Sequence, residues 1–463
     1  MTRERVEVVG VWTLLATLGV LVAVTMPELG SDPWPFKPPA VHPQGILGPL
    51  VRAANREWDL GIIRSVAVLA GLAVAIAAAA AWRFRSWPRW AAVGLAALVC
   101  SMLLVPAVLL QVGLRDATAP WYFTNDSTYQ IELAGDLILH GHDPYGHDYE
   151  GSGLERFYPA ADDQPTGFPQ VALEHFAYFP GTALTAAAWR LMPSPFDDYR
   201  IFVLLATLAL LPAALLFPGA LHWRLAVGSA LAANPLLVRG AWFGTADAPS
   251  LLALVLAFAL LARGRIVWAA VSLGAAVALK QFALVALPFF AVMLLTRGVP
   301  RQALRQAAAA FAGVVLAAFL PFLIADPGGL WSDTVAYGAS TYRIIGYGLS
   351  ALLLNAGILD DRFGYYPFLP LALLIWLPLT AWLLWNQRRA ATLWSGAIGF
   401  TVSMFVLLFL SRVFQNSYLA WPLTGIALAL LLAGVERSAR RPASAGSSAS
   451  AASGSAHRDA TSP

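Results

Sequence analysis

The sequence has little charge. Asp, Glu, Lys and Arg make up 12% of its 463 residues, whereas soluble domains carry about 25%. Hydrophobic residues make up 59%, and the mean hydropathy is +0.65. A water-soluble globule of this size would lack the polar surface that it needs, so the composition excludes a soluble protein. Apolar runs long enough to cross ~30 Å of hydrocarbon recur along the chain, which predicts an integral membrane protein.

Lysine and cysteine are nearly missing as well. Only Lys37 and Lys280 among 30 basic residues are lysines, and the arginines cluster at the ends of apolar runs. Basic residues in such places orient membrane helices, so the net charge of +4 does not indicate nucleic acid as a partner. Cys100 is the single cysteine, which excludes an intramolecular disulfide.

The common motifs of soluble enzymes are also missing. The sequence has no Gly-Lys-Ser/Thr phosphate loop, no His-Glu-x-x-His, no Cys-x-x-Cys and no Gly-x-Gly-x-x-Gly dinucleotide fingerprint. We therefore assign no cofactor and no metal ligand, and metal dependence stays open. Any catalysis has to come from polar residues at the membrane face.

The apolar runs predict an all-α fold, a polytopic transmembrane helical bundle of about 12 spans. Residues 1–89 would form an N-terminal helix pair with an outer loop, 90–435 a membrane catalytic domain, and 436–463 a disordered cytoplasmic tail. The thirteen candidate spans are 8–26, 61–81, 90–112, 173–192, 200–217, 224–240, 249–263, 266–280, 282–296, 306–325, 366–385, 391–410 and 419–435.

The arginines predict that both termini are cytoplasmic, since Arg3 and Arg5 precede the first span and Arg437, Arg440 and Arg441 closely follow the last. Two ends on one side require an even number of crossings, and thirteen is odd. Counting from the two termini disagrees only between 173 and 240. We therefore expect one segment there to be broken or re-entrant, as happens where backbone lines a cavity.

Three stretches are too polar to cross a membrane: 28–60, 113–172 and 326–348. Counting places all three outside the cell. The longest, 113–172, is rich in Asp, Glu and His, and we expect an amphipathic helix in it from Asp126 to about His140, because Tyr129, Leu133 and Leu137 recur at helical spacing.

Asp126 is the first candidate for chemistry. It lies in Asn125-Asp126-Ser127, three residues that all suit a helix N-cap, and Ser127 with Gln130 fits a capping box. A half-buried carboxylate at this place could also act as a general base. The local sequence by itself favours the cap.

A second candidate is the stretch from His140 to Asp148, with three histidines and two aspartates in nine residues. These side chains could bind zinc. Gly141, Pro144 and Gly146 are turn residues, however, and His and Asp are common in turns. We favour the turn.

Two further groups carry charge where a membrane protein has little. Lys280 lies in an apolar run, and insertion of a charged side chain there costs ~3 kcal/mol. Its flexible aliphatic stem could carry the ammonium to the membrane surface, or the ammonium could bind a phosphate. We favour the phosphate. Asp247, Arg343 and Arg412 lie near the outer face, with Arg239 close by. Arginines on the outer side are unusual, because basic residues are enriched on the cytoplasmic side of membrane proteins. These arginines therefore either bind a substrate or anchor the protein at the interface beside aromatic residues.

Several short motifs follow one another along the chain: Asp126 with Tyr129, Gly141-His142-Asp143-Pro144-Tyr145, Tyr178-Phe179-Pro180, Asn234-Pro235 before Gly244-Thr245-Ala246-Asp247, and Leu279-Lys280. Their order resembles the GT-C superfamily of membrane glycosyltransferases, in particular its polyprenol-phosphate-mannose-dependent bacterial branch. The resemblance covers roughly 90–430 and departs from the family pattern at Gly181, Thr245 and Gln281.

The resemblance implies a multi-pass enzyme of the bacterial plasma membrane with its active site on the extracytoplasmic side. It would move a hexose, with mannose favoured, from a polyprenyl-phosphate sugar to a glycolipid or glycan acceptor of the cell envelope. Asp126 would be catalytic. The substrate-binding residues would be Tyr129, Tyr145, Asp247, Lys280, Arg343 and Arg412. A lipid-linked sugar flippase or small-molecule transporter, and a non-enzymatic protein of envelope assembly, are the alternatives.

Overall fold

The computed structural model describes residues 45–55, 89–117, 124–158 and 173–439, together with a few single residues and short stretches between 17 and 76. Helices dominate this part of the chain, and the described strands are one parallel pair of two residues each, β1 and β2. The elements are α2 (Gly48–Asn55), α4 (Arg89–Ala117), α5 (Asp126–Leu139), η1 (Leu154–Phe157), α7 (Pro180–Trp189), α8 (Tyr199–Leu215), α9 (Leu221–Ala232), α10 (Pro235–Phe243), α11 (Asp247–Ala262), α12 (Ile266–Leu279), η2 (Gln281–Val285), α13 (Ala286–Thr296), α14 (Arg301–Ala325), α15 (Pro327–Trp331), η3 (Ser332–Thr341), β1 (Ile345–Gly346), α16 (Leu349–Asn355), α17 (Phe368–Leu371), η4 (Ala372–Trp376), α18 (Leu377–Ala390), α19 (Leu393–Leu410), β2 (Val413–Phe414), η5 (Asn416–Leu419) and α20 (Ala420–Ala439).

The predicted all-helical, polytopic fold is confirmed. Five helical stretches of the described chain are long and apolar enough to cross a membrane: Arg89–Asp116, Arg301–Ala325, Phe368–Ala390, Leu393–Leu410 and Asn416–Arg437. Shorter apolar helices run beside them at Tyr199–Leu215, Asp247–Ala262, Ile266–Leu279 and Gln281–Thr296. Most residues of the predicted spans 8–26 and 61–81 lie outside the described residues, and the tail beyond 439 lies wholly outside them.

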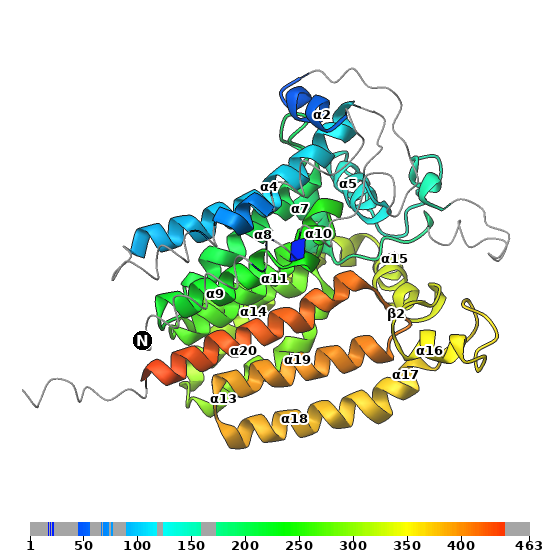
Figure 1. Cartoon of the computed structure of the whole chain (residues 1–463). Coiled ribbons are helices and arrows are strands. Elements are labelled where there is room, and N and C mark those ends of the chain that lie inside the picture. The colour runs from blue at the N-terminus through cyan, green and yellow to red at the C-terminus, as the bar shows by residue number, and fades with distance from the viewer. Residues whose placement is uncertain are drawn as a thin grey trace, which may run out of the picture.

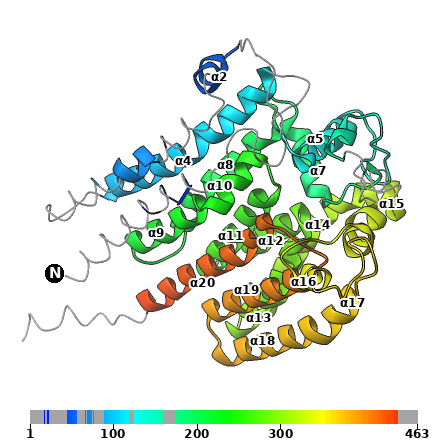
Figure 2. The same cartoon turned by 45° about the vertical axis from the view of Figure 1, so that its right-hand side comes forward.

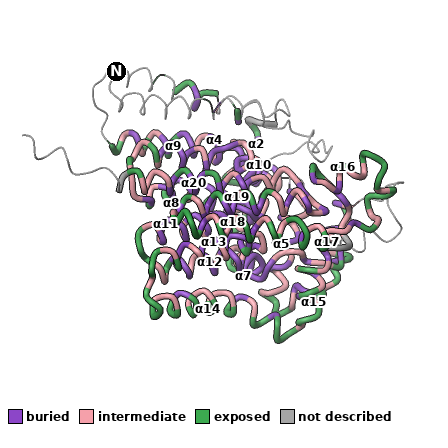
Figure 3. Tube along the Cα trace, turned by 90° about the horizontal axis from the view of Figure 1, so that it is seen from below, coloured by how far each residue is buried: buried purple, intermediate pink, exposed green. Residues whose placement is uncertain are grey.

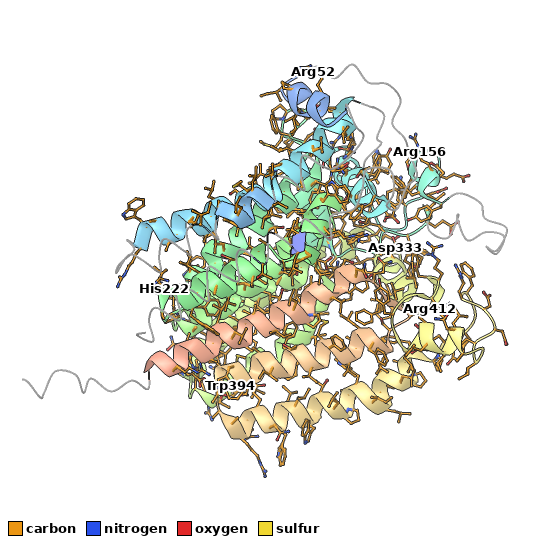
Figure 4. All side chains as sticks on the ribbon, in the orientation of Figure 1. Arg52, Arg156, His222, Asp333, Trp394 and Arg412 are labelled. Atoms are coloured by element: carbon orange, nitrogen blue, oxygen red, sulfur yellow. The ribbon has the colours of Figure 1, made fainter. Side chains whose placement is uncertain are left out.

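The bundle has two unlike ends (Figures 1 and 2). One end, which we call the loop end, carries α5, α15, α16 and β2 with their connecting loops. At the opposite end, the arginine end, α4 begins and α20 finishes, and α12, α14 and α19 start there too. Figure 4 places Asp333 and Arg412 at the loop end and His222 and Trp394 at the arginine end.

Helix α7 explains why the predicted number of spans was odd. It has ten residues, about 15 Å at 1.5 Å per residue, which is half of the hydrocarbon thickness. Gly181 at its start packs on the end of α12, and Arg190 just after its last residue pairs with Asp136 of α5. Both ends of α7 therefore lie at the loop end, and the predicted span 173–192 is wrong. Without it the expected crossings are even in number.

The predicted span 224–240 is interrupted, as expected for a segment in this region. Helix α9 ends at Ala232 and α10 starts at Pro235, whose missing N–H does no harm in the first turn of a helix. The Asn234 side chain caps α10 by accepting from the Leu237 N–H at 3.1 Å. The pair α9 and α10 leads back to the loop end, where Gly244 follows.

Burial is concentrated in the middle of the bundle (Figure 3). Only 17% of the apolar stretch of α14 and 11% of that of Phe368–Ala390 are buried within the protein. Apolar side chains that face outward along such helices suit hydrocarbon and would be unfavourable in water. The exposure therefore supports the same conclusion as the composition.

A buried ion network joins α4, α5 and α8 at the loop end. Arg115 of α4 donates to both carboxylate oxygens of Glu132 in α5, at 2.9 and 2.5 Å, and to Asp198 at 2.9 Å. Arg200 is fully buried and donates to Asp198 at 2.6 and 2.9 Å. The two arginines hold the pKa of Asp198 well below its usual range despite burial. This network fixes α5 across the end of the membrane bundle.

Accessibility of introduced cysteines tests this arrangement of ends. In a Cys100→Ala background, we expect Glu150→Cys and Asp360→Cys to react with a membrane-impermeant maleimide from the same side. Ala390→Cys, at the end of α18, should react only from the other side. Labelling of 150 and 390 from one side in sealed cells would contradict the fold.

Candidate functional site

A cavity of about 540 Å³ opens at the loop end. It is lined by α5, the stretch before α7, the start of α11, the junction of α12 with η2, and η3, with the end of α19 and residues 411–418 on the remaining wall. Four of the predicted site residues line it: Asp126, Asp247, Lys280 and Arg412. Its apolar lining comes from Leu284, Val335, Phe368, Leu407 and Leu408. Residues far apart in the sequence thus share one chamber with a polar and an apolar part.

Asp126 is not the cap of its helix. Asn125 is the N-cap of α5, and its side-chain oxygen accepts from the Thr128 N–H at 2.7 Å. The interpretation of Asp126 as the cap is therefore wrong. Its carboxylate accepts from the Ser127 N–H at 2.8 Å and from the Tyr158 hydroxyl at 3.2 Å, and it lines the cavity. The helix start can thus form without Asp126, which leaves the carboxylate available for chemistry.

The surroundings of Asp126 raise the pKa of its carboxyl above the ordinary value. Burial is the largest cause, because the charged form loses hydration, while the Ser127 N–H, the Tyr158 hydroxyl and the Arg343 charge act in the opposite direction. A carboxylate with a raised pKa is a stronger base than one in water. The carboxyl of Asp126 therefore has the property that a general base needs.

Lys280 and Asp247 form a buried ion pair at the cavity. The ammonium lies 2.6 Å from the Asp247 carboxylate, which also accepts from the Trp421 indole N–H at 2.7 Å. The Phe282 and Tyr418 rings lie 5.4 and 5.7 Å from the ammonium. Cations are attracted to aromatic faces at such distances. The pair explains why this lysine is tolerated in an apolar run: a carboxylate compensates its charge.

Arg412 has a structural task in addition to lining the cavity. Its guanidinium donates to three backbone carbonyls of the segment 342–364, those of Tyr342, Gly364 and Arg362; the latter two bonds are 2.9 and 3.3 Å long. It is 3% exposed, so interfacial anchoring is not its role. Arg412 holds this segment, which includes Tyr342 of the cavity wall, against the end of α19.

The other three predicted binding residues do not line the cavity. Tyr129 donates to the Ser152 carbonyl at 2.7 Å and packs on Phe157. Tyr145 is buried and donates to the Tyr178 carbonyl at 2.7 Å. Both tyrosines stabilise the long loop around the site. Arg343 is half-buried and acts on Asp126 through its charge.

Sequence reasoning missed two residues of this region. Asp333 of η3 is 1% exposed and accepts from the His175 ring at 2.7 Å and from two backbone N–H groups, of Gly146 and Phe176. His175 lines the cavity. The two residues lie 158 positions apart in the sequence, and no local pattern links them. The polar character of 326–348 was the only available signal.

The stretch from His140 to Asp148 forms turns. Gly141 and Gly146 have positive φ, of 79° and 62°, and Asp143 accepts from the Tyr145 N–H at 2.9 Å, two residues on. Such a bond is typical of an Asx turn. Among the described residues, no three His, Cys, Asp or Glu side chains are grouped so that they could hold a metal ion.

Comparisons with known proteins add little. No family model matches the sequence, and no curated protein matches it. A crystal structure of ArnT from Cupriavidus metallidurans bound to undecaprenyl phosphate aligns with 68% of this chain at 17% identity and a TM-score of 0.42. The aligned part spans 56% of that protein's length. We draw no functional conclusion from a likeness at this level.

The ion pair predicts how the two partners depend on each other. Asp247→Asn would leave the Lys280 ammonium buried without a carboxylate, which costs about 3–5 kcal/mol for a buried pair, so the Tm in detergent should fall clearly. The double variant with Lys280→Met should recover much of that loss, because both charges are then gone. Asp360→Asn, an exposed carboxylate at the loop end, is the matched control. Equal Tm values for Asp247→Asn and the control would contradict the pairing.

Proposed function

We propose that this protein is a GT-C-like membrane glycosyltransferase that moves a hexose from a polyprenyl-phosphate sugar to a glycolipid or glycan acceptor of the cell envelope. One observation carries the proposal. A single cavity at the membrane face joins a carboxylate of raised pKa, Asp126, to two buried cations, Lys280 and Arg412, beside an apolar lining. The motif order that resembles the GT-C superfamily supports it, and mannose is the favoured sugar on that resemblance.

The chemistry needs one base. The acceptor hydroxyl attacks the anomeric carbon, and the lipid phosphate leaves. Glycosidases use two carboxylates, one of which protonates a poor leaving group. A phosphate leaves more readily, so a second carboxylate is not required, and one carboxylate serves as the base that accepts the hydroxyl proton. Asp126 has this role in our proposal, because it faces the cavity and is not needed as a helix cap.

The cations would bind the phosphate. An ammonium has three N–H donors, and Lys280 uses one for Asp247, so two are left for phosphate oxygens. Asp247 and Trp421 would then position the lysine and not contact the donor themselves. Arg412 adds a fixed positive charge at the cavity wall. Fixed charges near a leaving group that gains negative charge stabilise the transition state without reorganisation.

The apolar part of the cavity supports a lipid donor. Leu284, Val335 and Leu407 would contact the first isoprene units while the phosphate stays at the depth of Lys280. Insertion of the lipid chain then fixes the depth of the phosphate in the membrane. This contributes to the orientation of the donor, which lowers the barrier to reaction. The arginines at the opposite end of the bundle favour the cytoplasm, so we place the loop end and its cavity on the extracytoplasmic side, where nucleotide sugars are not supplied.

A donor comparison tests this function. Purified protein in lipid is offered the same hexose on polyprenyl phosphate and on a nucleotide, with glycolipid and glycan acceptors, and glycosylated product is measured. We expect product from the polyprenyl-phosphate form only. Product from the nucleotide form alone would overturn the mechanism. Movement of the lipid-linked sugar across vesicles without any product would favour a flippase.

Replacing the proposed base tests its role. Asp126→Asn should lower kcat/KM by about 10²–10⁴-fold, the usual contribution of general acid–base catalysis, with an unchanged Tm because Asn125 caps α5. Asp360→Asn, an exposed carboxylate at the loop end, is the control. In the wild type, activity should fall as the pH drops through the raised pKa of Asp126, since only the deprotonated carboxylate accepts a proton. Wild-type turnover by Asp126→Asn would disprove the assignment.

A further inference from the structure

The cavity contains a second group that can carry a proton. The Nδ1 atom of His175 lies 2.7 Å from Oδ1 of Asp333, and the His175 carbonyl accepts from the Gln130 side chain at 2.8 Å. Gln130 lies one turn after Asp126 on α5, and both residues line the cavity. His175 is therefore tied to the wall that carries the proposed base. The function proposed above gives it no task.

Asp333 orients the histidine and is itself out of reach of a substrate. Its side chain is 1% exposed, and its second oxygen accepts from the Gly146 and Phe176 N–H groups, at 3.0 and 3.2 Å. A carboxylate on Nδ1 holds the Nδ1 proton in place, so the ring exchanges protons with other partners through Nε2. Histidine–carboxylate pairs of this kind serve as acids and bases in enzymes.

The remaining charges of the site leave the departing phosphate incompletely compensated. Asp247 already compensates the charge of Lys280. Arg412 supplies one positive charge, since the three carbonyls that it bonds are neutral. A lipid phosphate monoester gains a second negative charge when the sugar leaves. Transfer of a proton to it would remove that charge.

We propose that His175 is a second catalytic residue of the cavity, which donates its Nε2 proton to the departing phosphate, and that Asp333 is its positioning residue. This inference rests on the function proposed above. The bond between the acceptor oxygen and the anomeric carbon forms as the hydroxyl proton passes to Asp126. The bond from the anomeric carbon to the phosphate oxygen breaks, its electron pair stays on that oxygen, and the oxygen takes the proton from the His175 imidazolium.

Charge and protons balance in this step. Before it, the carboxylate, the imidazolium and the phosphodiester carry one net negative charge together. After it, the carboxylic acid and the imidazole are neutral, and the protonated phosphate monoester carries the negative charge. Passage of the proton from Asp126 to His175 through solvent restores the starting state. The enzyme therefore needs Asp126 deprotonated and His175 protonated at the same time.

The groups around His175 determine how its charge responds to pH. Asp333 and the Tyr337 ring face the His175 ring from η3, with the two ring centroids 4.5 Å apart, and Gln130 of α5 donates to the His175 backbone carbonyl. Asp126, Lys280 and Arg412 lie in the same cavity lining.

His175→Gln tests the proposal, since the Gln amide can still donate to Asp333 and keep the wall in place. We expect kcat/KM at pH 6.5 to fall by about 100-fold or more, within the range of general acid catalysis. The wild-type decrease above neutral pH should be absent in the variant. Asp333→Asn should lower kcat/KM at every pH, because an amide no longer fixes the ring proton. His142→Gln, an exposed histidine of the same loop, is the matched control with a wild-type profile.

Binding of polyprenyl phosphate gives a readout that does not depend on turnover. The wild type should bind it more weakly at pH 8 than at pH 6, and His175→Gln should bind it weakly with a smaller pH dependence. A wild type that transfers sugar from polyprenyl phosphate, together with a His175→Gln variant that keeps its pH profile and lipid affinity, would overturn this inference alone. A wild type that neither binds nor uses the lipid would overturn the proposed function and this inference with it.

Discussion

The ion network between Arg115, Glu132, Asp198 and Arg200 is the interaction on which the loop end depends. Helix α5 lies outside the membrane bundle, and bidentate pairing of Arg115 with Glu132 fixes it to α4. Such pairs have little freedom of geometry, and breaking a buried pair costs about 3–5 kcal/mol. Asp126 therefore keeps a fixed position relative to the membrane helices that carry Lys280 and Arg412.

A second constraint concerns the cavity itself, in which most charges are compensated. Lys280 has Asp247, His175 has Asp333, and Arg412 has backbone carbonyls. Buried ions without partners would be too costly at a membrane face. The arrangement leaves two donors of Lys280 available for an anionic group while Asp247 compensates the lysine's charge. In the function that we propose, the phosphate would bind at these donors and the lipid chain would lie on the apolar lining.

Hydrogen bonds stabilise the long polar loop. Two of them come from tyrosines that the sequence analysis had predicted to bind a substrate. Tyr129 and Tyr145 satisfy backbone carbonyls of the loop and of the stretch before α7. Asp333 joins that stretch to η3 and to the turn at Gly146. Loops of this length need such internal bonds, because their buried polar groups cannot rely on water. The described part of the loop, 124–158, is thereby held against the cavity, where Asp126 and Tyr158 line the wall.

The sequence by itself determined the helical membrane fold, the helix that starts at Asp126, and four residues that meet in one cavity, since hydrophobic periodicity and rare charges are local signals. The sequence could not show that residues 173–192 do not cross the membrane. An apolar run has the same local pattern whether it spans the bilayer or has both ends on one side of it. Tertiary structure alone decided that Lys280 pairs with Asp247 and that His175 meets Asp333. Each of these contacts depends on which donor and acceptor come within about 3 Å, and that distance is set by packing of distant segments.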